Sequence, residues 1–140
     1  MNNYLQNLPN LEIESQSSNI TLSIIVPCFN EINNIDQIIK AIKSSPIQNK
    51  EIIIIDDGST DGSKEYLENL NDDSIKIIFH NFNKGKGSAI SSGIKFARGK
   101  IIIIQDADLE YDPQEYPLLI NPILEGKADV VYGSRFKGSQ

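Results

Sequence analysis

Short runs of β-branched residues recur along the chain and are separated by segments with helical spacing. The runs lie at Leu22–Val26, Ile52–Ile55, Ile75–Phe79 and Ile101–Ile104, and a shorter fifth lies at Val130–Tyr132. Short runs that are apolar throughout are typical of strands buried on both faces. The alternation of strand and helix therefore predicts an α/β fold, with a mainly parallel sheet flanked by helices and right-handed crossovers.

The segments between the runs carry the apolar spacing of helices. Helical spacing is found within residues 32–42, 66–70 and 89–97. A fourth helix is expected to begin at Asp112, an N-cap that is followed by Pro113 at the first helical position. Glu115 would complete a capping box, and Pro122 should kink or shorten this helix.

The length of 140 residues suits one domain. Residues 1–20 form a leader rich in Asn, Gln and Ser, which we expect to be flexible, with a short helical piece around Tyr4–Leu8. Residues 21–140 would form the organised domain. The sequence has neither the pattern of a signal peptide nor an apolar segment near the roughly 20 residues that span a bilayer.

The charge balance is acidic, with 13 Lys and Arg against 19 Asp and Glu, a net charge of −6. Because no basic stripe offsets it, we do not expect a nucleic-acid partner. Cys28 is the single cysteine, so no internal disulfide forms, and we expect it to be a small buried hydrophobe near a strand end. His80 is the single histidine and a weak zinc candidate.

Polar residues follow every apolar run. In a parallel sheet covered by helices, ligands bind outside the carboxyl ends of the strands. The segments at those positions are Pro27–Glu31, Asp56–Gly62, Asn81–Gly87, Gln105–Glu110 and Gly133–Arg135. We therefore expect them to converge on one strongly acidic edge of the sheet.

Asp106 and Asp108 alternate about one alanine after the fourth run, so both can turn toward the same ion, and Glu110 is a candidate for a third oxygen. Clustered carboxylates repel one another, and a divalent cation such as Mg²⁺ or Mn²⁺ removes that cost. A metal here would neutralise a diphosphate leaving group. Lys84, Lys86 and the glycine-rich backbone around them are further candidates for phosphate contacts.

Each motif taken alone is weak. An isolated Asp56–Asp57 pair would indicate an Asx-turn that caps the next helix. Gly85–Ser88 hints at a phosphate loop, but His80–Phe82 stand where the Walker pattern has its first glycine, and Ile90 replaces the third glycine of a dinucleotide fingerprint. A calcium-loop pattern after the second run has Ser59 in place of an Asp or Asn and follows a strand instead of a helix.

Together, however, the motifs resemble the family-2 glycosyltransferases with the Rossmann-like GT-A fold. The likeness is nearest to the dolichyl-phosphate mannose synthases and related bacterial polyprenyl-phosphate glycosyltransferases, and it covers roughly Thr21–Phe136. The segments that carry it are Ile25–Glu31, Ile55–Gly62, Asn83–Gly87, Gln105–Pro113 and Val130–Arg135.

The resemblance implies a role for each matching residue. Pro27, Phe29 and Glu31 would cradle the nucleotide, with Phe29 where the family usually has Tyr, and Asp57 would contact the nucleobase. Positions near the base and ribose would be Asn83, Lys84 and Gly85.

The resemblance also implies roles in metal and acceptor binding for the motif that contains Asp106 and Asp108 and for the motif that contains Arg135. Asp106 and Asp108 would hold Mg²⁺ or Mn²⁺ against the nucleotide, and Glu110 can join the coordination sphere. Arg135 resembles the arginine that meets an acceptor phosphate.

The implied reaction is inverting transfer of a sugar from a UDP- or GDP-sugar to an acceptor, with a polyprenyl phosphate as the favoured one. The anionic phosphate would need no protein base, whereas a hydroxyl acceptor would need an Asp or Glu. Such a protein is expected in the cytoplasm, at the inner face of the membrane when the acceptor is a lipid.

Family members usually continue well beyond Phe136, so we expect the donor-binding half of the fold and little of the acceptor half. The alternative is a nucleotide-sugar-binding module without turnover. An incomplete sheet also leaves an edge that a homo-oligomer would cover. Other α/β enzymes fit less well: a nucleotidyltransferase needs a glycine-rich basic loop where Pro27–Glu31 stands, and a receiver domain needs an Asp where His80 and Asn81 stand.

Overall fold

A computed structural model describes residues 20–108, 110–124 and 131–132 of the chain. Its elements in chain order are β1 (Leu22–Cys28), α3 (Ile35–Lys43), β2 (Lys50–Asp57), α4 (Ser63–Glu68), β3 (Ile75–His80), α5 (Lys86–Ile94), β4 (Ile101–Ile104), η1 (Pro113–Glu115), α6 (Tyr116–Leu124) and β5 (Val131–Tyr132). The expected helical piece at Tyr4–Leu8, and the leader apart from residue 20, lie outside the described residues.

The strands form one five-stranded sheet in the order β3-β2-β1-β4-β5. All four strand pairs are parallel, which confirms the expected parallel sheet. The chain moves outward from β1 through β2 to β3 and then returns to place β4 on the other side of β1. The strand order therefore reverses between β1 and β4, which is where such sheets open a crevice for ligands.

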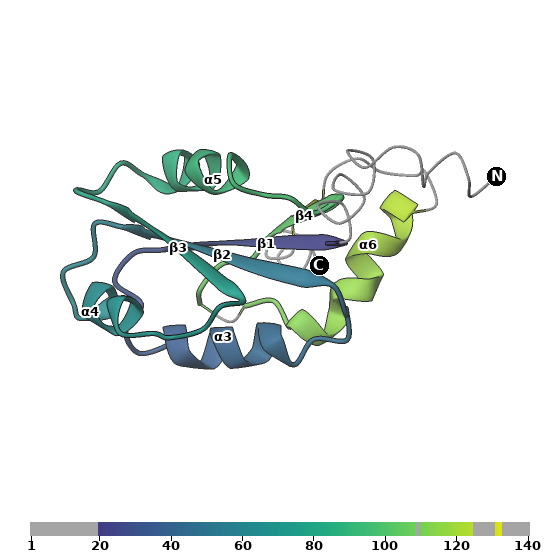
Figure 1. The fold of residues 1–140 in the computed structure, drawn as a ribbon, viewed down its shortest axis with the longest axis horizontal. Coiled ribbons are helices and arrows are strands. Elements are labelled where there is room, and N and C mark those ends of the chain that lie inside the picture. The colour runs from purple at the N-terminus through teal and green to yellow at the C-terminus, as the bar shows by residue number, and fades with distance from the viewer. Residues whose placement is uncertain (1–19, 109, 125–130, 133–140) are drawn as a thin grey trace, which may run out of the picture.

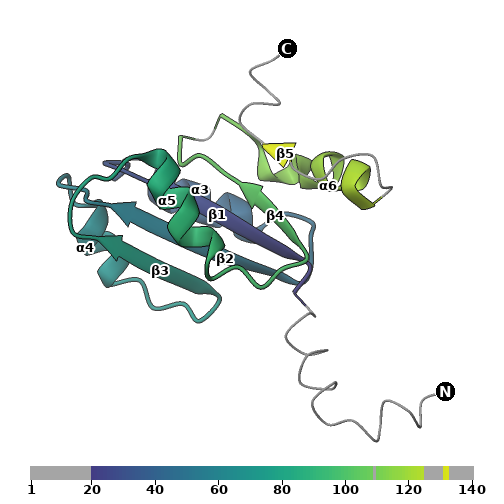
Figure 2. The same ribbon diagram turned by 90° about the horizontal axis from the view of Figure 1, so that it is seen from above.

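Helices cover both faces of this sheet (Figures 1 and 2). Alternate side chains of β1 point to opposite faces, so Ile24 and Val26 join the core under α3, α4 and α6, while Ile25 joins the core under α5. α5 lies very close to the sheet, since a Cβ on Gly93 would be 2.7 Å from Ile55 Cδ1 and 2.8 Å from Ile25 Cγ2. A glycine at position 93 is what permits this approach.

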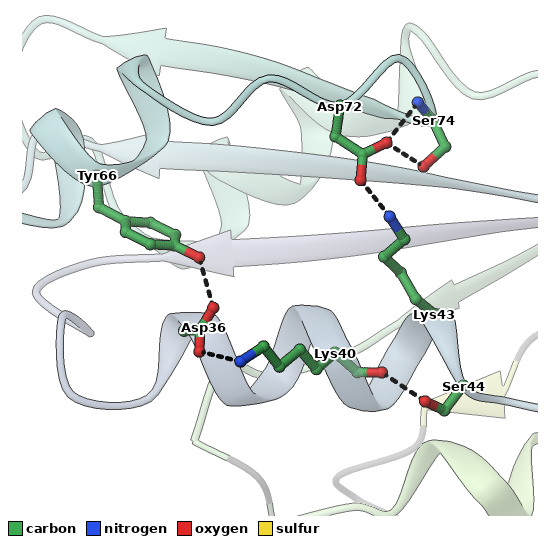
Figure 3. Close-up of polar contacts among 7 residues, drawn as sticks. All are labelled: Asp36, Lys40, Lys43, Ser44, Tyr66, Asp72 and Ser74. Carbon is green, nitrogen blue, oxygen red and sulfur yellow. Dashed lines mark hydrogen bonds and ion pairs between the residues drawn. The ribbon is translucent and has the colours of Figure 1, made fainter.

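Polar contacts fasten α3 to the segments beside it (Figure 3). The Tyr66 hydroxyl donates to Asp36 Oδ1 at 2.8 Å, and Lys43 forms an ion pair with Asp72 before β3. The hydrogen bond from Lys43 lowers the pKa of Asp72 to about 2. These contacts join α3 to α4 and to the β3 side of the sheet.

Two strands run further than their apolar runs. β1 extends to Cys28 and β2 extends to Asp57, so Asp56 and Asp57 are strand residues and not the start of a loop. The reason is that both residues continue the backbone pairing of the sheet, Asp56 with Cys28 and Phe79 and Asp57 with His80. Asp56 Oδ2 also accepts from the Ser59 amide at 3.2 Å. The Asx-type contact considered for this pair thus exists at Asp56, at the end of a strand.

The helix boundaries also differ from the expected ones. α3 begins at Ile35, after a turn in which the Asn34 and Ile35 amides donate to the Glu31 carbonyl and the Ile32 amide donates to Asp61 Oδ2 at 3.1 Å. α4 and α5 end at Glu68 and Ile94, before the last apolar residues of their patterns. No helix among the described residues is long and apolar enough to cross a membrane.

The segment after Asp112 begins as a 3-10 turn and not as an α-helix. Asp112 does act as the N-cap, but its side chain accepts from the Gln114 amide at 3.0 Å, and the Glu115 amide donates to the Asp112 carbonyl at 2.9 Å. These tight bonds replace the expected capping-box start. α6 then continues through Pro122 to Leu124.

Candidate functional site

A pocket of about 400 Å³ lies at the carboxyl ends of the central strands. The described residues that line it are Pro27, Cys28, Phe29, Glu31, Asp57, Asn83, Gly85, Lys86, Ala89, Asp106, Ala107 and Asp108. They come from the ends of β1, β2 and β4, the loop after β3 and the start of α5. The convergence expected from the sequence is therefore present at this edge of the sheet.

The loop after β1 is held in place by the loop after β2. Asn30 has a φ of 55°, a left-handed conformation that Asn tolerates better than most residues. Its amide donates to Ser59 Oγ at 2.9 Å, and its side-chain oxygen accepts from the Thr60 amide at 2.8 Å. The Glu31 amide donates to Ser63 Oγ at 3.0 Å. These bonds fix the backbone directly after Phe29, one of the pocket residues.

Asp57 anchors the loop after β3. Its Oδ1 lies 2.8 Å from His80 Nδ1 and accepts from the Lys84 amide at 2.9 Å, while its Oδ2 accepts from the Gly85 amide at 2.9 Å. Burial raises the pKa of Asp57, but the hydrogen bonds from Lys84, His80 and Gly85 outweigh it and hold the pKa below its usual value. Asp57 is thus an ionised group at neutral pH that shapes one wall of the pocket.

His80 links this carboxylate to α5, a role that the sequence did not reveal. Its Nε2 lies 2.8 Å from Ser92 Oγ, and its side chain is 6% exposed. His80 pairs with Asp57 in the register of β2 and β3. The sequence feature that could have suggested this contact is that Asp57 and His80 both lie just after apolar runs, and these runs form neighbouring strands. Asp57 lines the pocket but His80 and Ser92 are not among its described lining residues, so these two support the pocket wall through Asp57.

Gly58 allows the loops after β2 and β3 to touch. It has a φ of +79°, and a Cβ there would lie 2.6 Å from both the Asn83 amide nitrogen and the Phe82 carbonyl carbon. Any side chain at position 58 would push Asn83 from its place in the pocket lining. The glycine of this motif is therefore needed for pocket geometry.

The acidic pair lies where β4 becomes a turn. Asp106 and Asp108 both line the pocket. Buried Gln105 holds this turn by donating from Nε2 to the Asp106 carbonyl at 3.2 Å and to the Tyr111 carbonyl at 3.1 Å, and its Oε1 accepts from Tyr116 at 2.8 Å. The backbone that presents the acidic pair is thus held from inside the core.

Lys86 already compensates one of these charges. Its Nζ lies 2.5 Å from Asp106 Oδ1. Asp108 Oδ1 accepts a hydrogen bond from the Glu110 amide at 3.1 Å, and the Asp108 side chain is exposed. Within the described part of the chain, no three His, Cys, Asp or Glu residues gather closely enough to hold a metal by themselves. Asp106 and Asp108 are the described carboxylates that could share a cation here, with further oxygens from a ligand or water.

The remaining predicted site residues lie elsewhere. The Lys84 ammonium lies over the Phe82 ring, 5.4 Å from its centre, and only the backbone of Lys84 contacts Asp57. Glu110 is exposed and is not among the described lining residues. Arg135 lies outside the described residues. Cys28 is buried, and burial followed by the charges of Asp56 and Glu31 raises its pKa to about 12, so it is an inert thiol, as expected.

Comparison with known proteins identifies the family. The family described as Glycosyl transferase family 2 matches residues 23–140. The chain belongs to this family. It is 36% identical to a dolichol-phosphate mannosyltransferase of Mycosarcoma maydis, over 87% of this chain and 44% of the relative. It is 38% identical to an undecaprenyl-phosphate 4-deoxy-4-formamido-L-arabinose transferase of Proteus mirabilis, over 85% of this chain and 38% of the relative.

This family-2 chain also resembles solved structures. A mannosyltransferase from Pyrobaculum calidifontis, solved with GDP-Man and Mn²⁺, aligns with a TM-score of 0.59 and 25% identity, over 67% of this chain and 29% of that one. TarS of S. aureus aligns with a TM-score of 0.61 and 24% identity, over 70% and 30% of the two chains. The expected GT-A fold is confirmed, and so is the expected likeness to dolichyl- and polyprenyl-phosphate glycosyltransferases. The chain spans less than half the length of the curated relatives it matches.

Proposed function

We propose that this family-2 chain binds a nucleoside-diphosphate sugar, UDP- or GDP-linked, together with Mg²⁺ or Mn²⁺, and supports transfer of the sugar to a polyprenyl phosphate. The observation that carries the proposal is the pocket between β1 and β4, where the acidic pair and the predicted nucleotide-binding loops meet. Its volume of about 400 Å³ falls in the range of small-molecule sites.

The charge of the pocket supports a cation as part of the ligand. Glu31, Asp57, Asp106 and Asp108 line it against one ammonium, that of Lys86. An anionic diphosphate would be repelled by such a site unless a cation came with it. Mg²⁺ is commonly held by one or two carboxylates plus substrate phosphates, so Asp106 and Asp108 suffice as protein ligands when the diphosphate supplies the rest.

Each wall of the pocket can be assigned to a part of the proposed ligand. Phe29 offers a half-exposed ring for apolar packing, and Asn83 and Gly85 line the side held by Asp57. Asp57 Oδ2 accepts from the Gly85 amide and retains a lone pair that a nucleobase could reach, as the family resemblance implies. Asp106 and Asp108 would hold the cation, whose chemical contribution is to stabilise the departing diphosphate.

Transfer moves the sugar from one oxygen to another. An acceptor phosphate oxygen forms a bond to the anomeric carbon, and the bond from that carbon to the nucleoside diphosphate breaks, which inverts the configuration. The acceptor oxygen is already ionised, so no proton needs to be removed by the protein. Arg135 remains the candidate for contact with the acceptor phosphate, and membrane attachment would follow from that lipid.

Transfer is tested with a radiolabelled UDP- or GDP-sugar, Mn²⁺ and a short polyprenyl phosphate, with extraction of the lipid product. The matched control is the polyprenol that lacks the phosphate. We expect label only in the phosphorylated lipid. Equal labelling of both lipids would contradict the phosphate acceptor, and labelling of neither at high protein concentration would leave this chain as a donor-binding module without turnover.

A further inference from the structure

Lys86 connects two elements across the mouth of the pocket. It is the first residue of α5 and directly follows Gly85, whose φ of 100° and ψ of 159° fix where the helix begins. Its ammonium lies 2.5 Å from Asp106 Oδ1, in the turn after β4. Both residues line the pocket, so this ion pair occupies the place where the proposed cation would meet Asp106.

The two partners differ in their freedom to move. The Asp106 side chain is 18% exposed and belongs to a turn that Gln105 holds, whereas the Lys86 side chain is 58% exposed on a flexible stem. An oxygen in close contact with an ammonium is poorly placed to coordinate a metal, and two cations beside one carboxylate repel each other. A divalent cation can therefore take Asp106 only when Lys86 moves, and Lys86 is the partner that can.

We propose that Lys86 is an exchangeable counterion: it neutralises Asp106 while the pocket holds no donor, and it releases that carboxylate to the divalent cation when the diphosphate arrives. The freed ammonium, at the start of α5 beside the pocket, then binds a diphosphate oxygen. This inference rests on the proposed function and assigns a positioning and binding role to a residue outside the acidic pair. Its consequence is that metal and nucleotide bind cooperatively, because Lys86 opposes the metal alone and favours the metal with a diphosphate.

The competing explanation is a surface ion pair with no role in binding. Exposed ion pairs often contribute little to stability, so the contact alone does not decide. The two explanations predict different nucleotide affinities for a variant that lacks the Lys86 ammonium. Loss of the Lys86 ammonium should strengthen binding of the metal alone under both explanations, because a positive charge beside Asp106 is removed. It should weaken binding of a nucleoside diphosphate only if the ammonium moves to the ligand, whereas a passive pair would leave diphosphate binding unchanged or tighter.

The experiment measures Mn²⁺ binding by electron paramagnetic resonance on the full chain without nucleotide, for the wild type, Lys86→Met and Lys95→Met. Lys95 is exposed at the other end of α5, so its variant removes the same charge from the same helix away from the pocket. We expect Lys86→Met to bind Mn²⁺ about 3- to 10-fold more tightly than the wild type, and Lys95→Met to match the wild type. Equal Mn²⁺ affinity in Lys86→Met and the wild type overturns the proposal.

The second arm titrates UDP, GDP, UMP and GMP at saturating Mn²⁺. We expect Lys86→Met to bind the preferred diphosphate about 10-fold more weakly, with a smaller change for the monophosphate, and Lys86→Arg to recover most of the loss. Unchanged diphosphate affinity in Lys86→Met would refute the transfer of the ammonium to the ligand. If the wild type bound no nucleotide at all, the proposed function would fail, while the Mn²⁺ arm would still decide whether Lys86 competes for Asp106.

Discussion

At the level of single residues, Asp57 has two structural roles, one in a strand and one in holding a loop, and the sequence pattern does not show that one residue has both. It is the last residue of β2, and it is also the acceptor that fastens the loop after β3 through Lys84 and Gly85. A buried carboxylate with several donors is ionised and rigid. The wall of the pocket that carries Asn83 therefore depends on the Asp57 carboxylate, which holds the loop after β3 in place.

Replacing Asp57 by Asn should destabilise the fold. The amide group presents a donor to one of the backbone amides that the carboxylate now accepts, so we expect a loss of about 2–4 kcal/mol in the free energy of unfolding at pH 7. Because the folded-state pKa of Asp57 is lowered, its stabilisation is present above the unfolded value of about 3.9 and is lost as the pH falls through the folded value.

Urea unfolding between pH 7 and pH 3 checks this prediction. The difference in stability between the wild type and Asp57→Asn should be largest above about pH 5 and should shrink below pH 4. A difference that stays constant across this range would show that the Asp57 charge contributes nothing to the fold.

Gly58 offers a second prediction at this scale. Gly58→Ala combines a positive φ with a Cβ 2.6 Å from the backbone of Asn83, so we expect a loss of about 2–4 kcal/mol together with weaker nucleotide binding. Gly62→Ala is the matched control, because Gly62 also has a positive φ, +106°, but its Cβ would meet only Ile32 side-chain atoms at 3.6 Å. Chemical denaturation and nucleotide titration should separate the two, and equal loss in both variants would mean that the loop contact is unimportant.

The sequence predicted which residues would gather but not how they pair. Strand-end position sufficed to place Pro27, Glu31 and Asp106 near one another, because parallel strands end at a common edge. The contacts of His80 with Asp57 and Ser92 depend on strand register, and that of Lys86 with Asp106 depends on where α5 begins, neither of which the apolar pattern specifies.

At the level of elements, α5 is the helix that brings a loop into the pocket. It begins at Lys86 and covers the face of the sheet formed by Ile25, Ile53 and Ile55. Its small residues, Ala89 and Gly93, are the buried ones. Small side chains allow close approach to the sheet, and that approach sets the position of Gly85 and Lys86 at the pocket.

Enlarging Gly93 should therefore move α5. In Gly93→Ala, the gain in helix propensity of about 1 kcal/mol is opposed by overpacking against Ile55 and Ile25, which typically costs about 1–3 kcal/mol, so we expect a net loss of up to about 2 kcal/mol. Gly87→Ala is the control in the same helix, since a Cβ there meets nothing within 4 Å, and it should stabilise by up to about 1 kcal/mol. Thermal unfolding of the two variants measures both values, and stabilisation of both would contradict the close packing of α5.

Element types were predictable from the sequence, whereas several boundaries were not. Every described strand and helix falls on an apolar run or a helical pattern. β3 was expected to be buried on both faces, but it lies at the edge of the sheet and its side chains are half-buried or exposed. β2 runs to Asp57 because that residue pairs with His80 of β3, and the segment after Asp112 starts as a 3-10 turn around the Asp112 side chain. Pairing with another strand and local side-chain hydrogen bonds cannot be predicted from the hydrophobic pattern.

At the level of the whole molecule, the strand order concentrates negative charge at one crevice. Strand β2 ends in Asp57, the segments after β1 and β4 carry Glu31, Asp106 and Asp108, and the reversal of strand order opens the space among them. The family and the fold could be recognised from five ordered motifs in the sequence. The role of Arg135, and a homo-oligomer that covers exposed surface, remain predictions.

The central claim is that this crevice binds a nucleoside-diphosphate sugar through a divalent cation held by Asp106 and Asp108. Calorimetric titration of UDP- and GDP-sugars, with Mn²⁺ or with EDTA, tests it most directly in the wild type, Asp108→Ala and Asp73→Asn. Asp73 is an exposed acid outside the pocket and controls for the change in net charge. We predict binding of one donor that needs Mn²⁺, persists in Asp73→Asn and is at least about 100-fold weaker in Asp108→Ala. Binding that is equally tight in EDTA and in Asp108→Ala would contradict the account.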